Sequence, residues 1–271
     1  MYVSSVALGT HRRFTLHRLT RLGFAIALCV ATLGSHRATG NEYGPATFTS
    51  GPGKVQLLEL YTSEGCSSCP PAERWLSSWT QHPDLWLGVV PVVFHVDYWN
   101  YLGWEDPFSS SAWSDRQRRH AEEGGVRSVY TPGFVVDGRE WRGWFRGSSL
   151  PNRSRAAGTL EVSVQNNRVS ARYDALDGEP AKLSLEIALL GFDLTTPVRA
   201  GENRGRALTH QFSVLAHDRA EAVSQGAGNA WSLEIPQPRV SSERAALAVW
   251  VTAAGRLEPL QATGGWLPPT D

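Results

Sequence analysis

The stretch KVQLLELYTSEGCSSCPPAERW, residues 54–75, joins a short apolar run to two closely spaced cysteines. Residues 54–61 are apolar and of strand length, and TSEG then interrupts the run, so we predict a buried strand followed by a turn. A helix is expected from about residue 67 to residue 80, since prolines are tolerated in a first turn, where backbone N–H groups have no intrahelical partner. This arrangement places Cys66 and Cys69 at the start of a helix that follows a strand.

The following residues continue to alternate strand and helix. LGVVPVVFHVDYW, residues 87–99, has the apolar character of a second buried strand, and a polar helix is predicted from about residue 111 to 123. GFVVDGREWRGWF, residues 133–145, is typical of a hairpin, because Asp137-Gly138 supplies the positive φ angles of a tight primed turn. Strand, helix, strand, helix and hairpin together predict a small α/β sheet with mixed strand directions.

The C-x-x-C pair has the position of the redox site in thioredoxin-like proteins, where a strand leads into a helix that the cysteines open. The partial positive charge at a helix N-terminus favours a thiolate, which is the attacking species. We therefore predict that Cys66, the more exposed cysteine, is the nucleophile and that Cys69 resolves the mixed disulfide. Thr131-Pro132 precedes the hairpin where such proteins carry a cis-proline, so Pro132 is expected to face the cysteines and Thr131 to bind an extended partner.

Further candidate residues surround this pair in the sequence. Glu59 lies seven residues before Cys66, close to where thioredoxins keep a buried carboxylate that handles the proton of the inner thiol, but a salt bridge at a strand edge is an equal alternative. His95 and Asp97 end the second strand and are candidate substrate-binding residues, as is the neighbouring Trp99. Simpler roles remain open, since His95 could be a structural histidine and Trp99 could belong to aromatic packing that anchors the insert of residues 97–125.

The second half of the chain changes in composition. RGSSLPNRSRAAG, residues 146–158, has linker chemistry, and residues 158–265 read as six or seven strands separated by turns. The expected fold class is therefore an α/β thioredoxin-like domain over residues 54–147, followed by an antiparallel β-sandwich-like domain. GENRGRALTHQF is the most distinctive stretch of that half, and we expect a solvated loop that enters a strand, although Arg204, Arg206 and His210 could touch the first domain or an anionic ligand.

The N-terminal residues 1–40 indicate an export signal. A basic stretch precedes the apolar run LGFAIALCVATLG, which is too short to span a bilayer comfortably, so we predict a cleaved signal peptide and a secreted or periplasmic protein. Residues 1–40 carry five Arg and no acid, which leaves 21 basic and 26 acidic residues and a net charge of −5 after them. A mildly acidic chain does not favour nucleic acid or an anionic membrane as a partner.

Four long motifs resemble one family: ELYTSEGCSSCPPAE, FHVDYWNYLGWEDPFS, YTPGFVVDGREWRGW and VRAGENRGRALTH. They are similar to those of the DUF1223 family, predicted secreted proteins with a thioredoxin-like domain, and the resemblance spans about residues 54–265. It implies fold and export more strongly than activity, because the biochemical role of that family is poorly defined. The chain departs from ordinary thioredoxins, since Gly65 stands in place of the tryptophan of W-C-G-P-C.

These observations leave three functions open. The leading hypothesis is an exported thiol–disulfide oxidoreductase that acts on protein or small-molecule disulfides and needs no cofactor. The first alternative is a copper chaperone that binds Cu(I) through both thiolates and His95, because thiolates select Cu(I). The second is a binding module with the same fold and a permanently closed disulfide, which an exported compartment permits.

Overall fold

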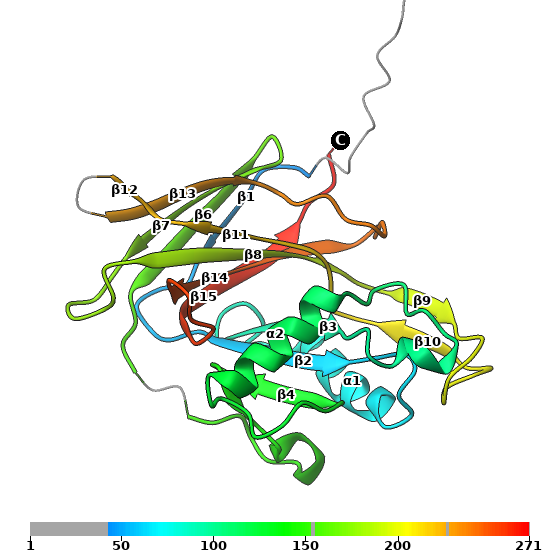
Figure 1. The fold of residues 1–271 in the computed structure, drawn as a ribbon. Helices are drawn as coiled ribbons and strands as arrows, with labels where there is room; N and C mark the ends of the chain where they lie inside the picture. The colour runs from blue at the N-terminus through cyan, green and yellow to red at the C-terminus, as the bar shows by residue number, and fades with distance from the viewer. Residues whose placement is uncertain (1–42, 153–154, 226–227, 271) are drawn as a thin grey trace, which may run out of the picture. The chain divides into compact units, whose positions relative to one another are not determined.

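A computed structural model describes residues 43–152, 155–225 and 228–270 of the chain (Figure 1). The predicted signal peptide, residues 1–40, lies outside these ranges. Within them, no helix combines the length and the apolar character needed to cross a membrane. Among the described residues the strands are more extensive than the α-helices, which are α1 (Cys69–Ser77) with nine residues and α2 (Ser111–Glu122) with twelve.

The largest sheet has eight strands in the order β15-β14-β8-β11-β3-β2-β4-β5 (Figure 1). Five other strands form a second sheet in the order β1-β6-β7-β13-β12, and β9 and β10 form a two-stranded sheet. The bounds of the strands are β1 (Ala46–Thr49), β2 (Gln56–Thr62), β3 (Val89–His95), β4 (Gly133–Val136), β5 (Arg139–Glu140), β6 (Thr159–Gln165), β7 (Arg168–Asp174), β8 (Leu183–Gly191), β9 (Leu194–Pro197), β10 (Ala207–His210), β11 (Ser213–Glu221), β12 (Val223–Gln225), β13 (Gly228–Glu234), β14 (Ala245–Ala253) and β15 (Pro259–Leu267).

The expected fold class, a thioredoxin-like α/β domain followed by a separate sandwich, is wrong. Strands from both sides of the predicted linker at residues 146–158 share the eight-stranded sheet, because β3 pairs in parallel with β11 where Val93 lies opposite Ser213. The Val93 N–H also donates to the Phe212 carbonyl at 2.9 Å. The apolar pattern predicts single strands, but it carries no information on which distant strand will pair with the edge of β3. The result is a mostly β, sandwich-like fold.

The individual elements of the first half agree with the sequence prediction. Every residue of β2 and β3 is buried, which explains their continuous apolar runs, and the two strands pair in parallel. Successive side chains of β2 point to opposite faces of the sheet. Tyr61 packs against His120 of α2, whereas Thr62 donates to Glu73 of α1, so the two helices cover opposite faces. The hairpin β4–β5 turns at Asp137-Gly138 with φ of 48° and 80°, as predicted.

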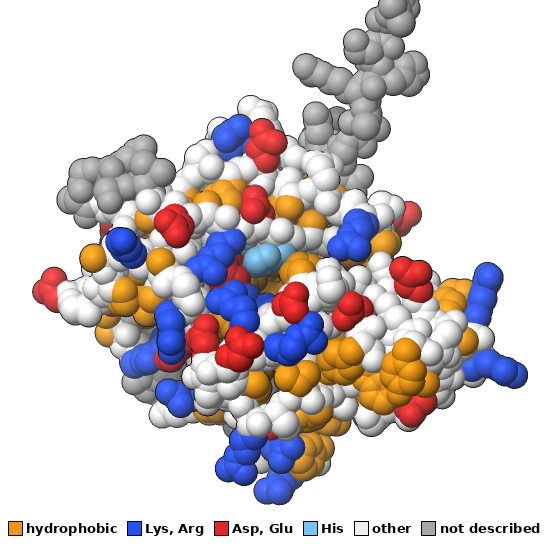
Figure 2. All heavy atoms as spheres, viewed as in Figure 1, with side chains coloured by type: hydrophobic (Ala, Val, Ile, Leu, Met, Phe, Trp, Pro, Cys, Tyr) orange, Lys and Arg blue, Asp and Glu red, His pale blue; other side chains and the backbone are white. Residues whose placement is uncertain are grey.

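The five-stranded sheet packs against the part of the large sheet that β8 and β14 form. Leu185, Ile187 and Val249 belong to the apolar core shared with β6, β7 and β13, whereas Trp250 points the other way and stacks with Arg116 of α2. The five-stranded sheet and α2 therefore cover opposite faces. On the face of the molecule seen in Figure 2, acidic and basic side chains are interspersed.

Candidate active site

The two cysteines lie at the C-terminal end of β2, where the chain turns into α1. Helix α1 begins at Cys69, with Ser68 as its N-cap and prolines in its first turn, as predicted. Cys66 precedes the helix in a turn in which the Cys69 N–H donates to the Cys66 carbonyl at 3.2 Å. Both thiols are free. Cys66 is the more accessible of the two, as expected, but the difference is small, because only 1% of its surface is accessible and Cys69 is fully buried.

The environment shifts the pKa values of the two thiols in opposite directions. The Cys69 thiol donates a hydrogen bond to the Cys66 sulfur, the Ser68 hydroxyl lies 3.2 Å from this sulfur, and these donors lower the pKa of Cys66 to about 6 against the burial that opposes them. Burial raises the pKa of Cys69 well above its ordinary value, and the nearby Cys66 adds to this increase. The pair therefore consists of a stabilised thiolate and a thiol that keeps its proton.

The turn before β4 faces Cys66. The Thr131–Pro132 peptide bond is cis, and the Thr131 carbonyl lies 4.0 Å from the Cys66 sulfur. Trp99 donates from its indole N–H to the Thr131 hydroxyl at 2.7 Å, and this hydroxyl helps to lower the pKa of Cys66. Among the predicted site residues, Thr131, Pro132 and Trp99 thus lie beside the cysteine pair. The contact with Thr131 gives Trp99 a role in fixing the turn.

A loop from the second half of the chain covers the other side of the cysteine turn. Residues 198–206, called here the 198–206 loop, connect β9 to β10. The buried Asn203 amide donates to the carbonyls of Glu64 and Cys66 at 2.9 and 2.8 Å, and the Glu202 carboxylate accepts from the Ser67 N–H at 2.8 Å. A Cβ on Gly201 would lie 3.2 Å from the Cα of Gly65, so the two backbones meet at glycines. Arg204, Gly205 and Arg206 are exposed, as expected of a solvated loop that enters a strand. The contacts of the buried Asn203 were not expected, because a loop carries no periodicity that indicates its contacts.

Glu59 belongs to a different polar cluster. Its carboxylate accepts from Arg116 and pairs with His120, both at 2.7 Å, on the face of the sheet that α2 covers. Arg116 also donates to the buried Glu186 at 2.7 Å. Burial alone would raise the pKa of Glu59, but Arg116 and His120 more than offset it and hold the pKa below the usual range. The alternative of a salt bridge thus describes the contacts of Glu59, although the bridge lies in the core instead of at a strand edge.

The carboxylate that acts on Cys69 is Glu73, which sequence reasoning missed. Glu73 follows Cys69 by one helical turn, and it raises the pKa of Cys69. It accepts from the Thr62 hydroxyl at 2.6 Å and pairs with His210 Nδ1 at 2.5 Å. The other ring nitrogen of His210 lies 2.8 Å from Glu64, which is fully buried. The spacing of four residues between Cys69 and Glu73 was the available sequence signal.

The remaining predicted residues, His95 and Asp97, diverge at the end of β3. His95 is buried, with Nδ1 2.8 Å from Asp106 and Nε2 3.3 Å from the Ser213 hydroxyl. Asp97 accepts a short hydrogen bond from Ser114 in the first turn of α2. These partners hold both side chains in the framework around the site, and their assignment to substrate binding stays a prediction.

Three side chains raise the question of a metal centre. One ligand atom each of Glu73, His95 and His210 lies within 4.8 Å of the others. However, both ring nitrogens of His210 already face carboxylates, and the 2.5 Å contact with Glu73 leaves no room for an ion between them. The neighbouring carboxylates also raise the pKa of His210 to about 10 although its burial acts to lower it, so the ring is a cation at neutral pH. We therefore interpret these residues as an ion-pair network.

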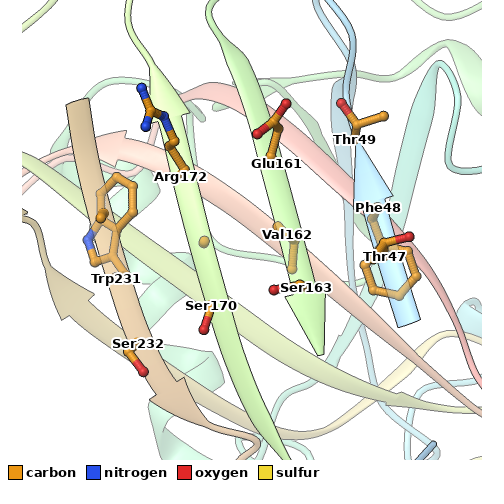
Figure 3. Close-up of a pocket in the computed structure, with 12 residues that line it drawn as sticks. Thr47, Phe48, Thr49, Glu161, Val162, Ser163, Ser170, Arg172, Trp231 and Ser232 are labelled. Atoms are coloured by element: carbon orange, nitrogen blue, oxygen red, sulfur yellow. The ribbon is translucent and has the colours of Figure 1, made fainter. Parts of the chain in front are cut away.

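A large pocket lies elsewhere, over the five-stranded sheet (Figure 3). It has a volume of about 770 Å³ and is lined by residues of β1, β6, β7 and β13. The hydroxyls of Thr47, Ser163, Ser170 and Ser232 lie opposite one another on these strands. None of the residues that line it belongs to the cysteine site. The pocket thus offers hydroxyl groups but no nucleophile with a shifted pKa, and the cysteine pair is the better candidate for chemistry.

Comparison with known proteins places the chain in a family. The family model described as "Protein of unknown function (DUF1223)" matches residues 57–252, which include the cysteine turn, the Thr131–Pro132 turn and the 198–206 loop. The chain belongs to the DUF1223 family. A search of the curated proteins finds no match for this DUF1223 protein.

Two solved structures resemble the DUF1223 protein. Protein AGR_C_4864 from Agrobacterium tumefaciens has a TM-score of 0.55 and 24% identity, with 80% of this chain and 96% of that chain covered. HBP35 of Porphyromonas gingivalis has a TM-score of 0.50 and 17% identity, with coverage of 80% and 77%. At such identities the likeness concerns the fold alone. Each match extends over both sides of residues 146–158, because neither side alone holds 80% of the chain.

Proposed function

We propose that this protein is an exported thiol–disulfide oxidoreductase that acts on disulfides of partner proteins or small molecules through Cys66 and Cys69. The observation that carries the proposal is the opposed pKa shift of two adjacent thiols. With a pKa of about 6, Cys66 is a thiolate at neutral pH, whereas Cys69 keeps its proton until it is needed. A structural pair has no need of this asymmetry, because a closed disulfide carries neither charge.

The proposed reaction has two steps. The Cys66 thiolate attacks one sulfur of the partner's disulfide, a mixed disulfide forms, and the other partner sulfur leaves as a thiolate. The Cys69 sulfur then gives up its proton and attacks Cys66, which closes the Cys66–Cys69 disulfide and releases the second partner thiolate. The partner gains two electrons and the cysteine pair loses them. The same steps in reverse oxidise a partner dithiol, and the relative reduction potentials decide the direction.

The surroundings of Cys66 fit a partner of extended shape. The Thr131 carbonyl lies 4.0 Å from the sulfur, at the edge of the turn that leads into β4. Since Cys66 is nearly inaccessible in this structure, a disulfide can reach the sulfur only if the turn that Trp99 holds or the 198–206 loop moves aside. Export is supported by the basic and apolar character of residues 1–40.

A Cu(I) chaperone is the weaker alternative, because His95, its expected third ligand, is engaged by Asp106 and Ser213. A redox titration decides between exchange and a non-catalytic binding module. The protein without residues 1–40 is equilibrated with glutathione couples of defined potential, alkylated and analysed by mass spectrometry. We expect one reversible two-electron transition that involves both cysteines, and a Cys69→Ser variant that accumulates mixed disulfides through Cys66. A pair that stays closed or stays unreactive at all potentials rules out the proposed function.

A further inference from the structure

The ion-pair network behind Cys69 suggests how this thiol loses its proton. We propose that Glu73 accepts the Cys69 proton through the Thr62 hydroxyl during the resolving step, and that His210 holds Glu73 as the anion that can accept it. This inference rests on the proposed function, because it describes the second step of the same exchange. Glu73 and His210 act through Thr62 and are therefore positioning residues.

The contacts form a continuous path that begins at the inner thiol. Thr62 ends β2 and its hydroxyl interacts with Cys69. The same hydroxyl donates to Glu73 Oε1 at 2.6 Å, and Glu73 Oε2 pairs with His210 Nδ1 at 2.5 Å. Thr62, Glu73 and His210 are all buried, so no bulk water is at hand to take the proton. A hydroxyl between a thiol and a carboxylate can pass a proton on, since it accepts and donates at the same time.

The charge of the network favours an ionised Glu73. Burial would raise the pKa of Glu73, but the His210 cation more than offsets this and lowers it. Glu64 faces the other side of the ring at 2.8 Å. The ring of His95 lies 4.9 Å from that of His210 and is paired with Asp106. His210 is thus the cation that directly contacts Glu73, and it comes from β10, at the end of the distinctive GENRGRALTH stretch.

The proton and the electrons balance in this step. As the Cys69 sulfur bonds to Cys66, its proton moves to the Thr62 oxygen and the hydroxyl proton of Thr62 moves to Glu73. The bond between Cys66 and the partner sulfur breaks, and the partner leaves as a thiolate. One negative charge therefore moves from Glu73 to the leaving sulfur, and Glu73 returns its proton to solvent or to the product thiolate once the site opens. The protein needs no added acid or base.

A reagent with a chromophoric leaving thiol separates the two steps. Reduced protein is mixed with 5,5′-dithiobis(2-nitrobenzoate) in a stopped-flow instrument, where attack by Cys66 releases one nitrothiobenzoate and attack by Cys69 releases the second. In Glu73→Gln we expect the first phase to keep its rate and the second to slow by about a hundredfold, a typical contribution of a general base. In His210→Gln the cation that lowers the pKa of Glu73 is lost, so burial should raise the pKa of this carboxyl group. The second phase is therefore expected to slow at neutral pH and to recover at a higher pH, where Glu73 is ionised.

Matched variants exclude a merely structural effect. Glu186→Gln alters a buried carboxylate that pairs with Arg116 on the other face, and both of its phases should keep the wild-type rates. Thr62→Val removes the hydroxyl at nearly constant volume, and Thr62→Ser restores it. The second phase should be slow in the first of these and close to wild type in the second, which tests the path even if Glu73→Gln does not fold.

The outcomes distinguish this inference from the proposed function. A second phase that keeps its rate and pH profile in Glu73→Gln or Thr62→Val overturns the proton path and leaves the oxidoreductase intact. Wild-type protein that shows no release of the chromophore at all overturns both. Bound metal in a one-to-one ratio with purified protein, lost in His210→Gln, would also overturn the path, since a metal-bound Glu73 cannot accept the proton.

Discussion

The low pKa of Cys66 depends first on the thiol of Cys69, and Cys69→Ala removes that donor. Four hydrogen bonds hold the pKa at about 6 instead of its ordinary 9.0, and they come from the Cys69 thiol, the Ser68 and Thr131 hydroxyls and the Ser68 N–H. Their combined effect exceeds this net difference, because burial acts in the opposite direction. Since the Cys69 thiol is the largest contributor, its loss should raise the pKa of Cys66 by at least about one unit.

The shift has a signature in the rate of alkylation. At pH 6 the thiolate fraction should fall about fivefold, while each remaining thiolate becomes about threefold more nucleophilic, since reactivity rises with basicity. The pH–rate profile for iodoacetamide should therefore move its midpoint up by about one unit, and its plateau at high pH should rise about threefold. Restricted access of the reagent to Cys66 lowers the rates in both proteins alike and does not contribute to the difference between their midpoints.

Cys69→Ser is the matched control, because its hydroxyl can still donate to the Cys66 sulfur. Its midpoint should lie between those of the wild type and of Cys69→Ala. Ultraviolet absorbance of the thiolate gives an independent titration of the same group. A wild-type midpoint near 9, or a midpoint in Cys69→Ala that stays near 6, would refute the reasoning that the inner thiol stabilises the outer thiolate.

Three further predictions concern stability. Arg116→Met removes the guanidinium that Glu59 and Glu186 share in the core and should lower the free energy of unfolding in urea by about 3–5 kcal/mol. Arg118→Met, at an exposed ion pair, should lower it by less than about 1 kcal/mol, and equal losses would contradict this. Asn203→Ala should cost about 1–3 kcal/mol and speed the alkylation of Cys66, and an unchanged alkylation rate would show that the loop is not the cover. The pKa of His210 is raised from 6.5 to about 10, so the stabilisation that the protonated ring provides is complete below pH 6.5 and is lost as the pH rises through 10. Between pH 7 and pH 10 the urea midpoint should therefore fall more in the wild type than in His210→Gln.

The local elements around the cysteines could be predicted because their signals are local. The apolar runs of β2 and β3 reflect burial on both faces, and the prolines after Cys69 mark the first turn of α1. Asp137-Gly138 predicts the β4–β5 hairpin because these residue types readily adopt the positive φ angles that its turn requires. These residues determine their own conformation with little help from distant parts of the chain.

The assembly of the sheet and the inner part of the site could not be predicted in the same way. The pairing of β3 with β11 joins residues more than a hundred positions apart, and the sequence pattern of neither strand indicates which strand it will pair with. The polar turn around Glu64 carries no signal of burial, whereas the 198–206 loop and His210 contact and bury this residue. The alternation in β10, with Leu208 and His210 buried, was the one signal that pointed His210 inward.

The contribution of Asn203 and His210 has a consequence for biosynthesis. A ribosome completes residues 66–69 more than a hundred residues before it adds the segment that caps them. The growing polypeptide therefore holds both thiols without the cover of Asn203 and the 198–206 loop while it is made. Any disulfide that forms in this interval forms at uncovered thiols, and the enclosed site of the folded protein arises only when the last third of the chain has docked.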